Sequence, residues 1–291
     1  MQAILITAYK NYSHLEDIID FFDHNFSIYI HIDRKSYISQ QELSKLRNKA
    51  NVHYISQTYK INWGGINHLK AIIELLGEAV KNSDNNYFHL ITGHDYPIKP
   101  LDEFISLEKD NTRIYMEYHT LPYQPWPEGG MDRLSRYNMY DLIDGRSGLG
   151  ERLIKGFSKL QKKLGIKRGF DKNFPKLYGG STYWSLSREA VEYCFRYMDE
   201  HPEYYPRFKY SFCSEEIFFQ TILLNSELKE KIINDNKRFI VWEERNGNFP
   251  ANLDDSDYNN IKNSQALFAR KFEFPISEAL LTEIKKSLSI S

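Results

Sequence analysis

The first hundred residues alternate short apolar runs with amphipathic stretches, and this pattern constrains the fold more than any other feature of the chain. The apolar runs cover 3–8, 26–33, 52–55 and 87–92, and the stretches with helical spacing cover 13–22, 41–48 and 67–80. Strands that alternate with helices are typical of parallel sheets with right-handed crossovers. The sequence therefore predicts an α/β fold with a Rossmann-like, mostly parallel central sheet flanked by helices.

Polar residues follow three of the predicted strands. Thr7 ends the first strand, His31 and Asp33 end the second, and Asp95 follows the fourth. Ligands of parallel sheets bind at the carboxyl ends of the strands, so these residues are candidates for a binding site. Each cluster alone is also typical of a turn, and Asp95 could instead brace its loop through backbone hydrogen bonds.

Composition and missing motifs exclude several classes of protein. The 38 basic and 39 acidic residues leave a net charge of −1, so no overall positive field points to nucleic acid. The chain contains neither G-x-G-x-x-G nor G-x-x-x-x-G-K-[ST], which argues against dinucleotide oxidoreductases and P-loop enzymes. Its two cysteines, Cys194 and Cys213, are expected to be reduced thiols of a cytoplasmic protein. No apolar run reaches the roughly 18 residues of a transmembrane helix.

The stretch from Tyr178 to Ile222 contains the main candidate for catalysis. It has a glycine pair, a strand-like run, a helical pattern, and then Glu215 and Glu216 in front of an apolar run that predicts another helix. An acid at a helix start commonly complements the free amides of the first turn. Alternatively, partial desolvation raises the pKa of a glutamate at such a position and makes it a general base.

Several segments resemble the core-2/I-branching β-1,6-N-acetylglucosaminyltransferase family, which includes the peptide xylosyltransferases. These segments are IHID at 30–33, NWGG at 62–65, YFHLITGHDYPIK at 87–99, GGSTYWSLSRE at 179–189, SEEIFFQTI at 214–222 and LFARKFE at 267–273. The resemblance implies a glycosyltransferase of the GT-A type. It places Glu216 on the family's catalytic base and leaves Glu215 as the helix-start acid.

The strand-end argument and the resemblance together imply that the first half of the chain, 1–110, binds a nucleotide-sugar. The implied contacts are Thr7, His31, Asp33, Trp63, Gly64 and Asp95, with Arg245 and Lys271 joining from the C-terminal part. Lys271 matches the family lysine that binds the diphosphate. Arg245 lies nine residues before an aspartate, a spacing similar to that of a phosphate-binding family arginine. The ordinary alternative for both is a solvated surface cation.

No metal or other cofactor is expected. The branching enzymes that the chain resembles stabilise the leaving diphosphate with basic side chains in place of a metal ion. The only D-x-D sequence, Asp255-Ser256-Asp257, is far from the usual position of a metal-binding D-x-D. A cluster at a helix N-cap explains it better.

The second half of the chain, 111–291, is predicted to bind the acceptor and to carry the base, within one glycosyltransferase domain that covers the whole chain. An aromatic ring can stack on a sugar and still hydrogen-bond. Trp126, Tyr183 and Trp184 are therefore candidate acceptor contacts. Glu117 lies near the position of an acceptor-binding glutamate in the resembled family.

The segment 151–170 is the one part of the chain with a strong local excess of positive charge. It carries seven basic residues, and Leu153, Phe157, Leu160 and Leu164 recur in it at helical spacing. One interpretation is a surface helix that packs on the domain through these apolar residues. The other is a basic amphipathic helix in peripheral contact with the anionic inner face of a membrane.

The function expected from the sequence is inverting, metal-independent transfer of a sugar, GlcNAc or xylose by the resemblance, from a UDP-sugar to a hydroxyl of a glycan acceptor. Synthesis of a bacterial surface polysaccharide, in which the acceptor could be lipid-linked, is the expected setting, and no nucleic acid partner is expected. Two alternatives stay open. One is a hydrolase that uses two carboxylates, Glu216 with Glu117 or Asp95, and the other is a non-catalytic carbohydrate-binding relative.

Overall fold

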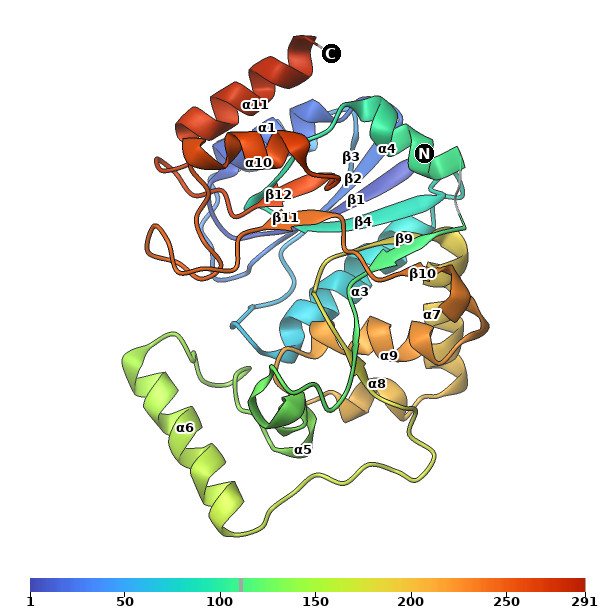
Figure 1. The fold of residues 1–291 in the computed structure, drawn as a ribbon, viewed down its shortest axis with the longest axis vertical. Helices are drawn as coiled ribbons and strands as arrows, with labels where there is room; N and C mark the ends of the chain where they lie inside the picture. Colours follow the sequence, from blue (N-terminus) through green and yellow to red (C-terminus); the bar gives the residue numbers. More distant parts are fainter. Residues whose placement is uncertain (110–111, 291) are drawn as a thin grey trace.

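The computed structural model describes residues 1–109 and 112–290, and its centre is a sheet of seven strands (Figure 1). The strands are β1 (Gln2–Ala8), β2 (Phe26–Ile32), β3 (Val52–Ser56), β4 (Tyr87–Thr92), β6 (Ile114–Met116), β9 (Trp184–Ser187) and β10 (Ile232–Ile233). Their order is β10-β6-β9-β4-β1-β2-β3, and β9 runs antiparallel to both of its neighbours while the other pairs are parallel. The predicted α/β fold, with a mostly parallel central sheet flanked by helices, is confirmed.

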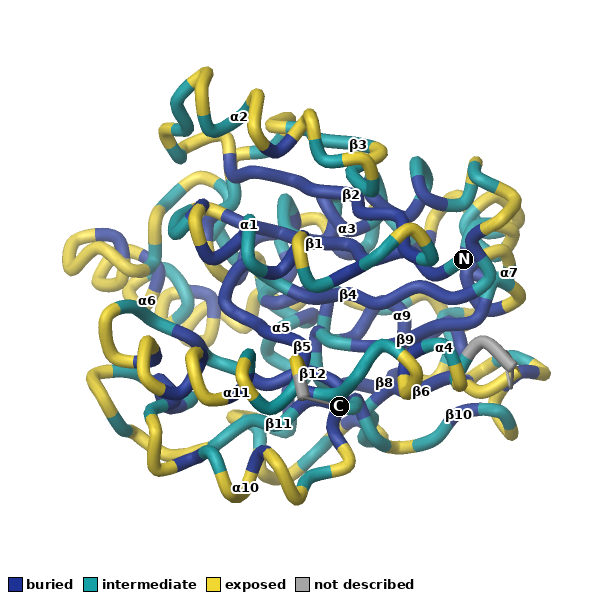
Figure 2. The backbone as a smooth tube through the Cα atoms, turned by 90° about the horizontal axis from the view of Figure 1, so that it is seen from above, coloured by how far each residue is buried: buried dark blue, intermediate teal, exposed yellow. Residues whose placement is uncertain are grey.

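Helices cover both faces of this sheet, because its strands are apolar on both sides. The helices are α1 (Tyr12–Phe21), α2 (Gln40–Arg47), α3 (Ile66–Val80), α4 (Leu101–Lys109), α7 (Arg188–Glu200), α8 (Tyr204–Arg207), α9 (Phe218–Leu224), α10 (Tyr258–Asn263) and α11 (Glu278–Ile290). Along β1, Ala3 and Leu5 pack in a core with α3, α7 and α9, whereas Ile4 and Ile6 pack in a core with α1, α10 and α11. Figure 2 shows the central strands as the buried middle of the molecule.

A second sheet of three strands brings the C-terminal motif to the end of β4. Its strands are β11 (Arg238–Ile240), β12 (Phe268–Arg270) and β5 (Asp95–Pro97), in the order β11-β12-β5. β12 runs antiparallel to β5, and Arg270 lies opposite Asp95 in the register. Lys271, the next residue, therefore lies near the carboxyl end of β4, on the edge where parallel sheets bind ligands.

The segment between β6 and β8 (Tyr178–Gly179) is mostly irregular. It contains β7 (His119–Thr120), the 3₁₀ turn η1 (Pro127–Gly130), α5 (Asp132–Ser135) and α6 (Gly148–Lys163). In Figure 1 α6 stands away from the sheet, at the edge of the molecule. The predicted helix is thus confirmed, but Leu153, Leu160 and Leu164 are exposed, so the interpretation that they pack on the domain is wrong.

The two halves of the chain share both cores. Leu5 lies in the same core as Phe218, and Ile6 lies in the same core as Phe268. The boundary that we place between the halves, at residues 110 and 111, lies outside the described residues. Within the part of the chain that the structure describes, no helix combines the length and the apolar character needed to cross a bilayer.

Candidate active site

Glu216 sits in a 3₁₀ turn, η2 (Ser214–Glu216), that precedes α9. Glu215 and Glu216 both lie in this turn, and because α9 begins at Phe218, neither lies in the first turn of α9 itself. The glycine pair holds this turn, since the backbone N–H of Gly180 donates to the carbonyl oxygen of Glu216 at 2.8 Å. Gly180 has no room for a side chain, because a Cβ there would lie 1.9 Å from a backbone carbonyl oxygen.

Arg133 forms an ion pair with the Glu216 carboxylate. Arg133 comes from α5, and its guanidinium carbon lies 3.7 Å from the ring centroid of Trp126. The Glu216 side chain is 26% exposed. Desolvation raises its pKa above the ordinary value, and the charge of Arg133 opposes this rise. A partly exposed carboxylate with a raised pKa has the properties of a general base. Trp126 thus lies beside the site, and its contact with an acceptor stays a prediction.

Glu215 is buried next to Glu216 and has a different partner. Its Oε1 lies 3.0 Å from Nδ1 of His68, and Nε2 of His68 lies 3.2 Å from the hydroxyl oxygen of Thr7. His68 belongs to the first turn of α3, and Thr7 belongs to the end of β1. These contacts tie the turn that carries both acids to the carboxyl end of the central sheet.

Three other basic side chains act electrostatically on Lys271. Burial, followed by the charges of Arg270, Lys10 and Arg146, lowers the pKa of Lys271 to about 8. Glu273 opposes this shift, but it already pairs with Lys10 at 2.8 Å. Basic side chains that destabilise one another in this way favour the binding of an anion, so the basic group suits a diphosphate.

Tyr183 contacts this basic group. The guanidinium carbon of Arg270 lies 4.2 Å from the ring centroid of Tyr183, and its Nη1 lies 3.3 Å from Oδ1 of Asp95. Asp95 is fully buried, and its Oδ2 accepts hydrogen bonds from the backbone N–H and the hydroxyl of Thr92. Asp95 therefore braces its loop and orients Arg270, which corrects the expectation that it contacts the nucleotide-sugar. Tyr183 lies three residues after Gly180, so one short segment supports both Glu216 and the basic group.

His31 and Asp33 hold loops with buried side chains. Nε2 of His31 accepts a hydrogen bond from the backbone N–H of Tyr59 at 3.0 Å, and burial lowers the pKa of His31 to about 4. Asp33 accepts hydrogen bonds from the backbone N–H groups of Lys35 and Ile61, at 2.9 and 3.1 Å. Both side chains therefore shape the loop that leads from β3 to α3, and their contact with a nucleotide-sugar stays a prediction.

Trp63 and Gly64 join that loop to the residues in front of Glu216. The Trp63 ring is 49% exposed and lies edge-on to Phe212, with 5.1 Å between the ring centroids. Gly64 has a φ of +82°, and a Cβ there would lie 2.4 Å from the Phe212 ring. Its carbonyl oxygen accepts a hydrogen bond from the backbone N–H of Cys213 at 3.0 Å. Trp63 therefore keeps an exposed face near the site, and its contact with a nucleotide-sugar stays a prediction.

Two of the predicted acceptor contacts have partners inside the protein. Trp184 is fully buried in β9 and packs against Phe219, with 5.4 Å between the ring centroids, so the prediction that it contacts an acceptor is wrong. The Glu117 side chain is 35% exposed, and its Oε2 accepts a hydrogen bond from Nδ2 of Asn236 at 2.9 Å. Glu117 therefore keeps exposed surface, and its acceptor contact stays a prediction.

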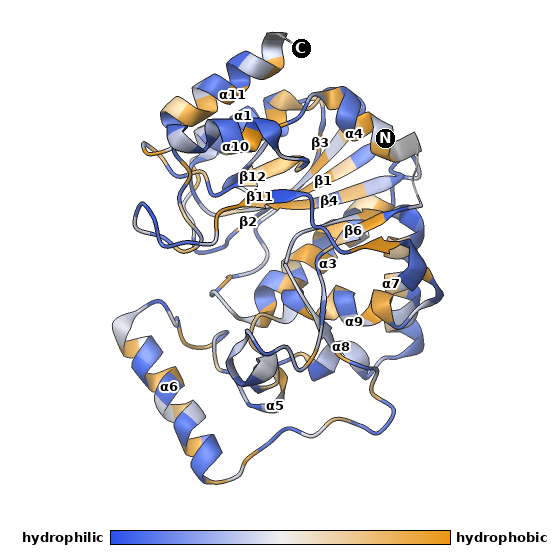
Figure 3. Cartoon of the chain, viewed as in Figure 1, coloured by the Kyte–Doolittle hydropathy of each residue, from blue (hydrophilic) through white to orange (hydrophobic). Residues whose placement is uncertain are grey.

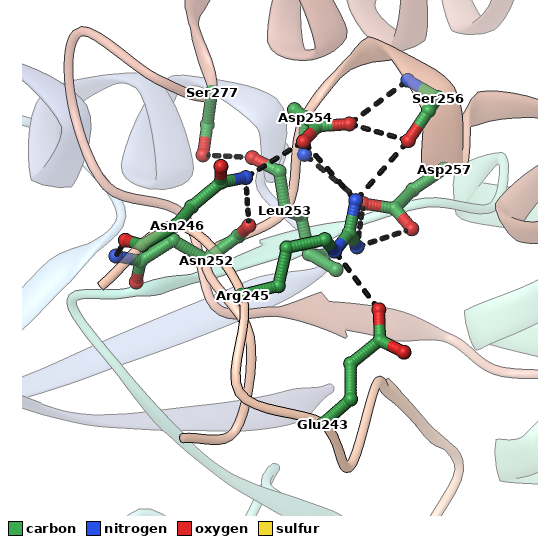
Figure 4. Close-up of polar contacts among 9 residues, drawn as sticks. All are labelled: Glu243, Arg245, Asn246, Asn252, Leu253, Asp254, Ser256, Asp257 and Ser277. Atoms are coloured by element: carbon green, nitrogen blue, oxygen red, sulfur yellow. Dashed lines mark hydrogen bonds and ion pairs between the residues drawn. The ribbon is translucent and has the colours of Figure 1, made fainter. Parts of the chain in front are cut away.

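Arg245 is surrounded by acidic side chains (Figure 4). Its Nη2 donates to both carboxylate oxygens of Asp257 at 2.7 Å, and its Nη1 donates to Asp254 and Ser256 at 3.1 Å. Its Nε lies 3.0 Å from Oε1 of Glu243. Both Nη atoms thus donate hydrogen bonds within the chain, whereas Nε is close to a carboxylate without a hydrogen bond. These contacts give Arg245 a structural role in its loop, and binding of a diphosphate by Arg245 would require it to give up one of them.

The D-x-D sequence has the role that the sequence predicts for it. Asp254 caps the 3₁₀ turn η4 (Asp255–Asp257), and Asp254 and Asp257 form a reciprocal capping box. Across residues 1–109 and 112–290, no three His, Cys, Asp or Glu side chains are grouped so as to hold a metal ion.

Sequence reasoning missed five residues of the site. They are Lys10, His68, Arg133, Arg146 and Arg270. Arg270 carried a signal, because it stands next to Lys271 in a matching motif. The other four are single basic or imidazole side chains in unremarkable sequence, and only contacts between distant segments bring them to the site.

The sequence of the chain is similar to those of known proteins. A family model described as Core-2/I-Branching enzyme matches residues 3–263. Xylosyltransferase 1 of Mus musculus is 22% identical over 315 residues, covering 97% of this chain and 29% of the relative. Beta-glucuronosyltransferase GlcAT14A of Arabidopsis thaliana is 26% identical over 287 residues, covering 88% of this chain and 57% of the relative. The chain thus spans less than two thirds of the length of either relative.

A solved structure of the galactosyltransferase LgtC in complex with donor and acceptor sugar analogs overlaps 99% of this chain and 96% of its own, at 11% identity. Its TM-score of 0.40 is too low for this likeness to carry a conclusion. The family model, in contrast, covers most of the sequence, including the glycine pair, the acidic pair and the strand-end motifs. The chain therefore belongs to the Core-2/I-Branching enzyme family of glycosyltransferases.

Proposed function

We propose that this protein transfers a sugar from a UDP-sugar to a hydroxyl group of a glycan, with inversion at the anomeric carbon and without a metal ion. The observation that carries the proposal is the position of Glu216. In a chain of this family, it is a partly exposed carboxylate with a raised pKa, held by Gly180 and Arg133.

In the proposed reaction, the Glu216 carboxylate takes the proton of the acceptor hydroxyl as the hydroxyl oxygen attacks C1 of the donor sugar. The bond between C1 and the diphosphate oxygen breaks, and its electron pair leaves with UDP. Attack from the face opposite UDP gives a β-linked product from an α-linked donor. General-base assistance of this kind contributes about 10²–10⁴-fold to the rate.

The negative charge that develops on the leaving diphosphate is stabilised by the basic group of Lys10, Arg146, Arg270 and Lys271. Fixed positive charge at the leaving group can take the role that a divalent metal has in other transferases. We therefore expect full activity in excess EDTA. Loss of activity that Mn²⁺ or Mg²⁺ restores would refute metal independence while leaving the transfer reaction itself intact.

The donor sugar is proposed from the family. The resemblance suggests UDP-GlcNAc and UDP-xylose. The name of one relative agrees with xylose, and the name of the other adds glucuronic acid as a transferred sugar. A panel of these three donors, tested for thermal stabilisation and for slow hydrolysis without acceptor, identifies the one that fits. Stabilisation by UDP also separates the transferase from a two-carboxylate hydrolase, which has no need of a nucleotide.

The variant Glu216→Gln tests the assignment of the base. We expect kcat to fall by about 10²–10⁴-fold or more, with unchanged thermal stabilisation by UDP, because the amide keeps the shape of the side chain but cannot accept the proton. Glu227→Gln, at an exposed position outside the site, is the matched control. Near-normal turnover of Glu216→Gln would show that another group is the base.

A further inference from the structure

α6 leaves an apolar stripe exposed to solvent. Leu149, Leu153, Leu160 and Leu164 are 70%, 52%, 50% and 61% exposed, and their spacing places them on one face of the helix. Figure 3 shows hydrophobic and hydrophilic residues around α6, at the edge of the molecule and apart from the central sheet. Four exposed leucines on one helix face form a patch of the kind that marks an interaction site.

A different face of α6 attaches it to the protein. Ile154 and Gln161 are buried, and Gln161 bonds to both backbone polar groups of Tyr137, accepting from its N–H at 2.8 Å and donating to its carbonyl oxygen at 3.0 Å. The Ser158 hydroxyl accepts a hydrogen bond from Arg136 at 3.3 Å. Ile154 lies roughly 100° around the helix from Leu153. The attachment is thus mainly polar, and it leaves the leucine stripe without a partner among the described residues.

Basic residues line the border of the leucine stripe that faces away from Ile154. Arg152, Lys159 and Lys163 are exposed and lie roughly 80–120° from Leu153, on the side away from Ile154. These three form no ion pair with any described residue. The segment 150–170 holds seven basic residues and one acidic residue, a net charge of +6, in a chain whose total is −1.

We propose that the outward face of α6 binds the surface of a membrane that contains anionic lipids. An apolar stripe with a basic border is the arrangement of helices that lie in the membrane interface, where the leucines enter the acyl boundary and the basic residues meet the headgroups. A nucleic acid would leave the leucines without an apolar partner. A second copy of the chain would bring two basic borders together, and their like charges repel.

The membrane surface would then lie next to the acceptor side of the site. Arg136 and Tyr137, which attach α6, directly follow α5, and α5 carries the arginine that pairs with Glu216. A glycan anchored in the same membrane would reach the base with little further loss of translational freedom, because the anchor already restricts it. The proposal concerns binding alone and does not rest on the transfer reaction.

The test is co-sedimentation of the full chain with phosphatidylcholine vesicles, prepared with and without phosphatidylglycerol, at low and high salt. One variant combines Lys159→Glu with Lys163→Glu, and another combines Leu153→Ser with Leu160→Ser. The matched control combines Lys45→Glu with Arg47→Glu, two exposed positions on α2, which Figure 2 shows at another edge of the molecule. Thermal unfolding verifies that each variant is folded.

We expect binding to the phosphatidylglycerol vesicles alone, weakened by salt. Each α6 variant should lose about tenfold or more of this binding, and the control should keep it. The proposal is overturned by no binding, by equal binding to both vesicles, or by equal loss in the control. It is also overturned if the wild type is a dimer that does not bind vesicles and the leucine variant is a monomer. Because no readout is activity, failure of the transfer proposal would not change these results.

Discussion

Arg133 pairs with Glu216 across 83 residues of sequence while its guanidinium stacks on Trp126. The pair joins the irregular segment between β6 and β8 to the turn in front of α9. It also sets the chemistry of the acid, because the positive charge favours the carboxylate form that a general base requires, against the desolvation that favours the protonated form.

Replacing Arg133 by Gln should move the acid limb of the pH profile. Without the positive charge the pKa of Glu216 rises further, so kcat/KM at neutral pH falls and recovers as the pH is raised. The measurement is kcat/KM against pH for wild type and variant. Arg196→Gln removes an exposed arginine that faces Glu227 at 3.7 Å and serves as the control. An unchanged acid limb in Arg133→Gln would contradict the role of this pair.

Lys271 should set the alkaline limb of the same profile. Its ammonium must be charged to hold the diphosphate, and its pKa is lowered to about 8, so kcat/KM should fall as the pH rises through about 8. The bound diphosphate favours the charged amine, so the corresponding limb of kcat should lie at higher pH. Lys271→Arg should shift the kcat/KM limb to a more alkaline pH, because arginine stays protonated. A limb that does not move would assign the titration to another group.

Gly180→Ala should damage both stability and activity. The new methyl group would lie 1.9 Å from the carbonyl oxygen of Glu117, and the backbone must move to relieve this contact. We expect a loss of roughly 1–3 kcal/mol in the free energy of unfolding. We also expect a lower kcat, because the Gly180 N–H holds the Glu216 carbonyl at 2.8 Å.

The control for this substitution is Gly156→Ala in α6, where nothing lies within 4 Å of the new Cβ. It should stabilise the protein by roughly 0.5–1 kcal/mol, because alanine favours a helix over glycine. Thermal unfolding and turnover, measured on both variants, show whether the loss is specific to Gly180. Equal effects at the two positions would show that the close approach at Gly180 has no special role.

Arg245→Met should lower stability without weakening the binding of UDP. It removes the partner of Asp254 and Asp257, and the loss of hydrogen bonds between charged groups costs roughly 1–3 kcal/mol. Thermal unfolding with and without UDP measures both quantities. If UDP affinity fell strongly at unchanged stability, Arg245 would be the phosphate ligand that the spacing to Asp254 suggests.

Much of the fold follows from local patterns that the sequence displays directly. Buried runs such as 87–92 become central strands because they are largely apolar, and 67–80 becomes a helix because its apolar residues recur with helical period. The same local information marks the glycine pair and Glu216, since a matching motif needs only neighbouring residues. The fold class and the family of this protein were therefore available from its sequence alone.

Tertiary structure decided which side chains are free to act. Asp95 and Arg245 look like ligand contacts in the sequence, but Thr92 and Arg270 engage the first, and Asp254, Ser256 and Asp257 engage the second. These partners lie between 3 and 175 residues away, and the more distant ones become partners only when strands and loops pack.

Arg133 and the exposed face of α6 are the opposite case, because the structure shows a role or an exposure that the sequence does not mark. Nothing near Arg133 in the sequence marks it as the partner of Glu216, and the periodicity of α6 identifies an apolar face without showing whether anything covers it. Local spacing determines which face of an element is apolar and which motif it carries. Only contacts between distant segments determine which of those groups are buried, paired or left exposed, because burial and pairing are properties of two surfaces together.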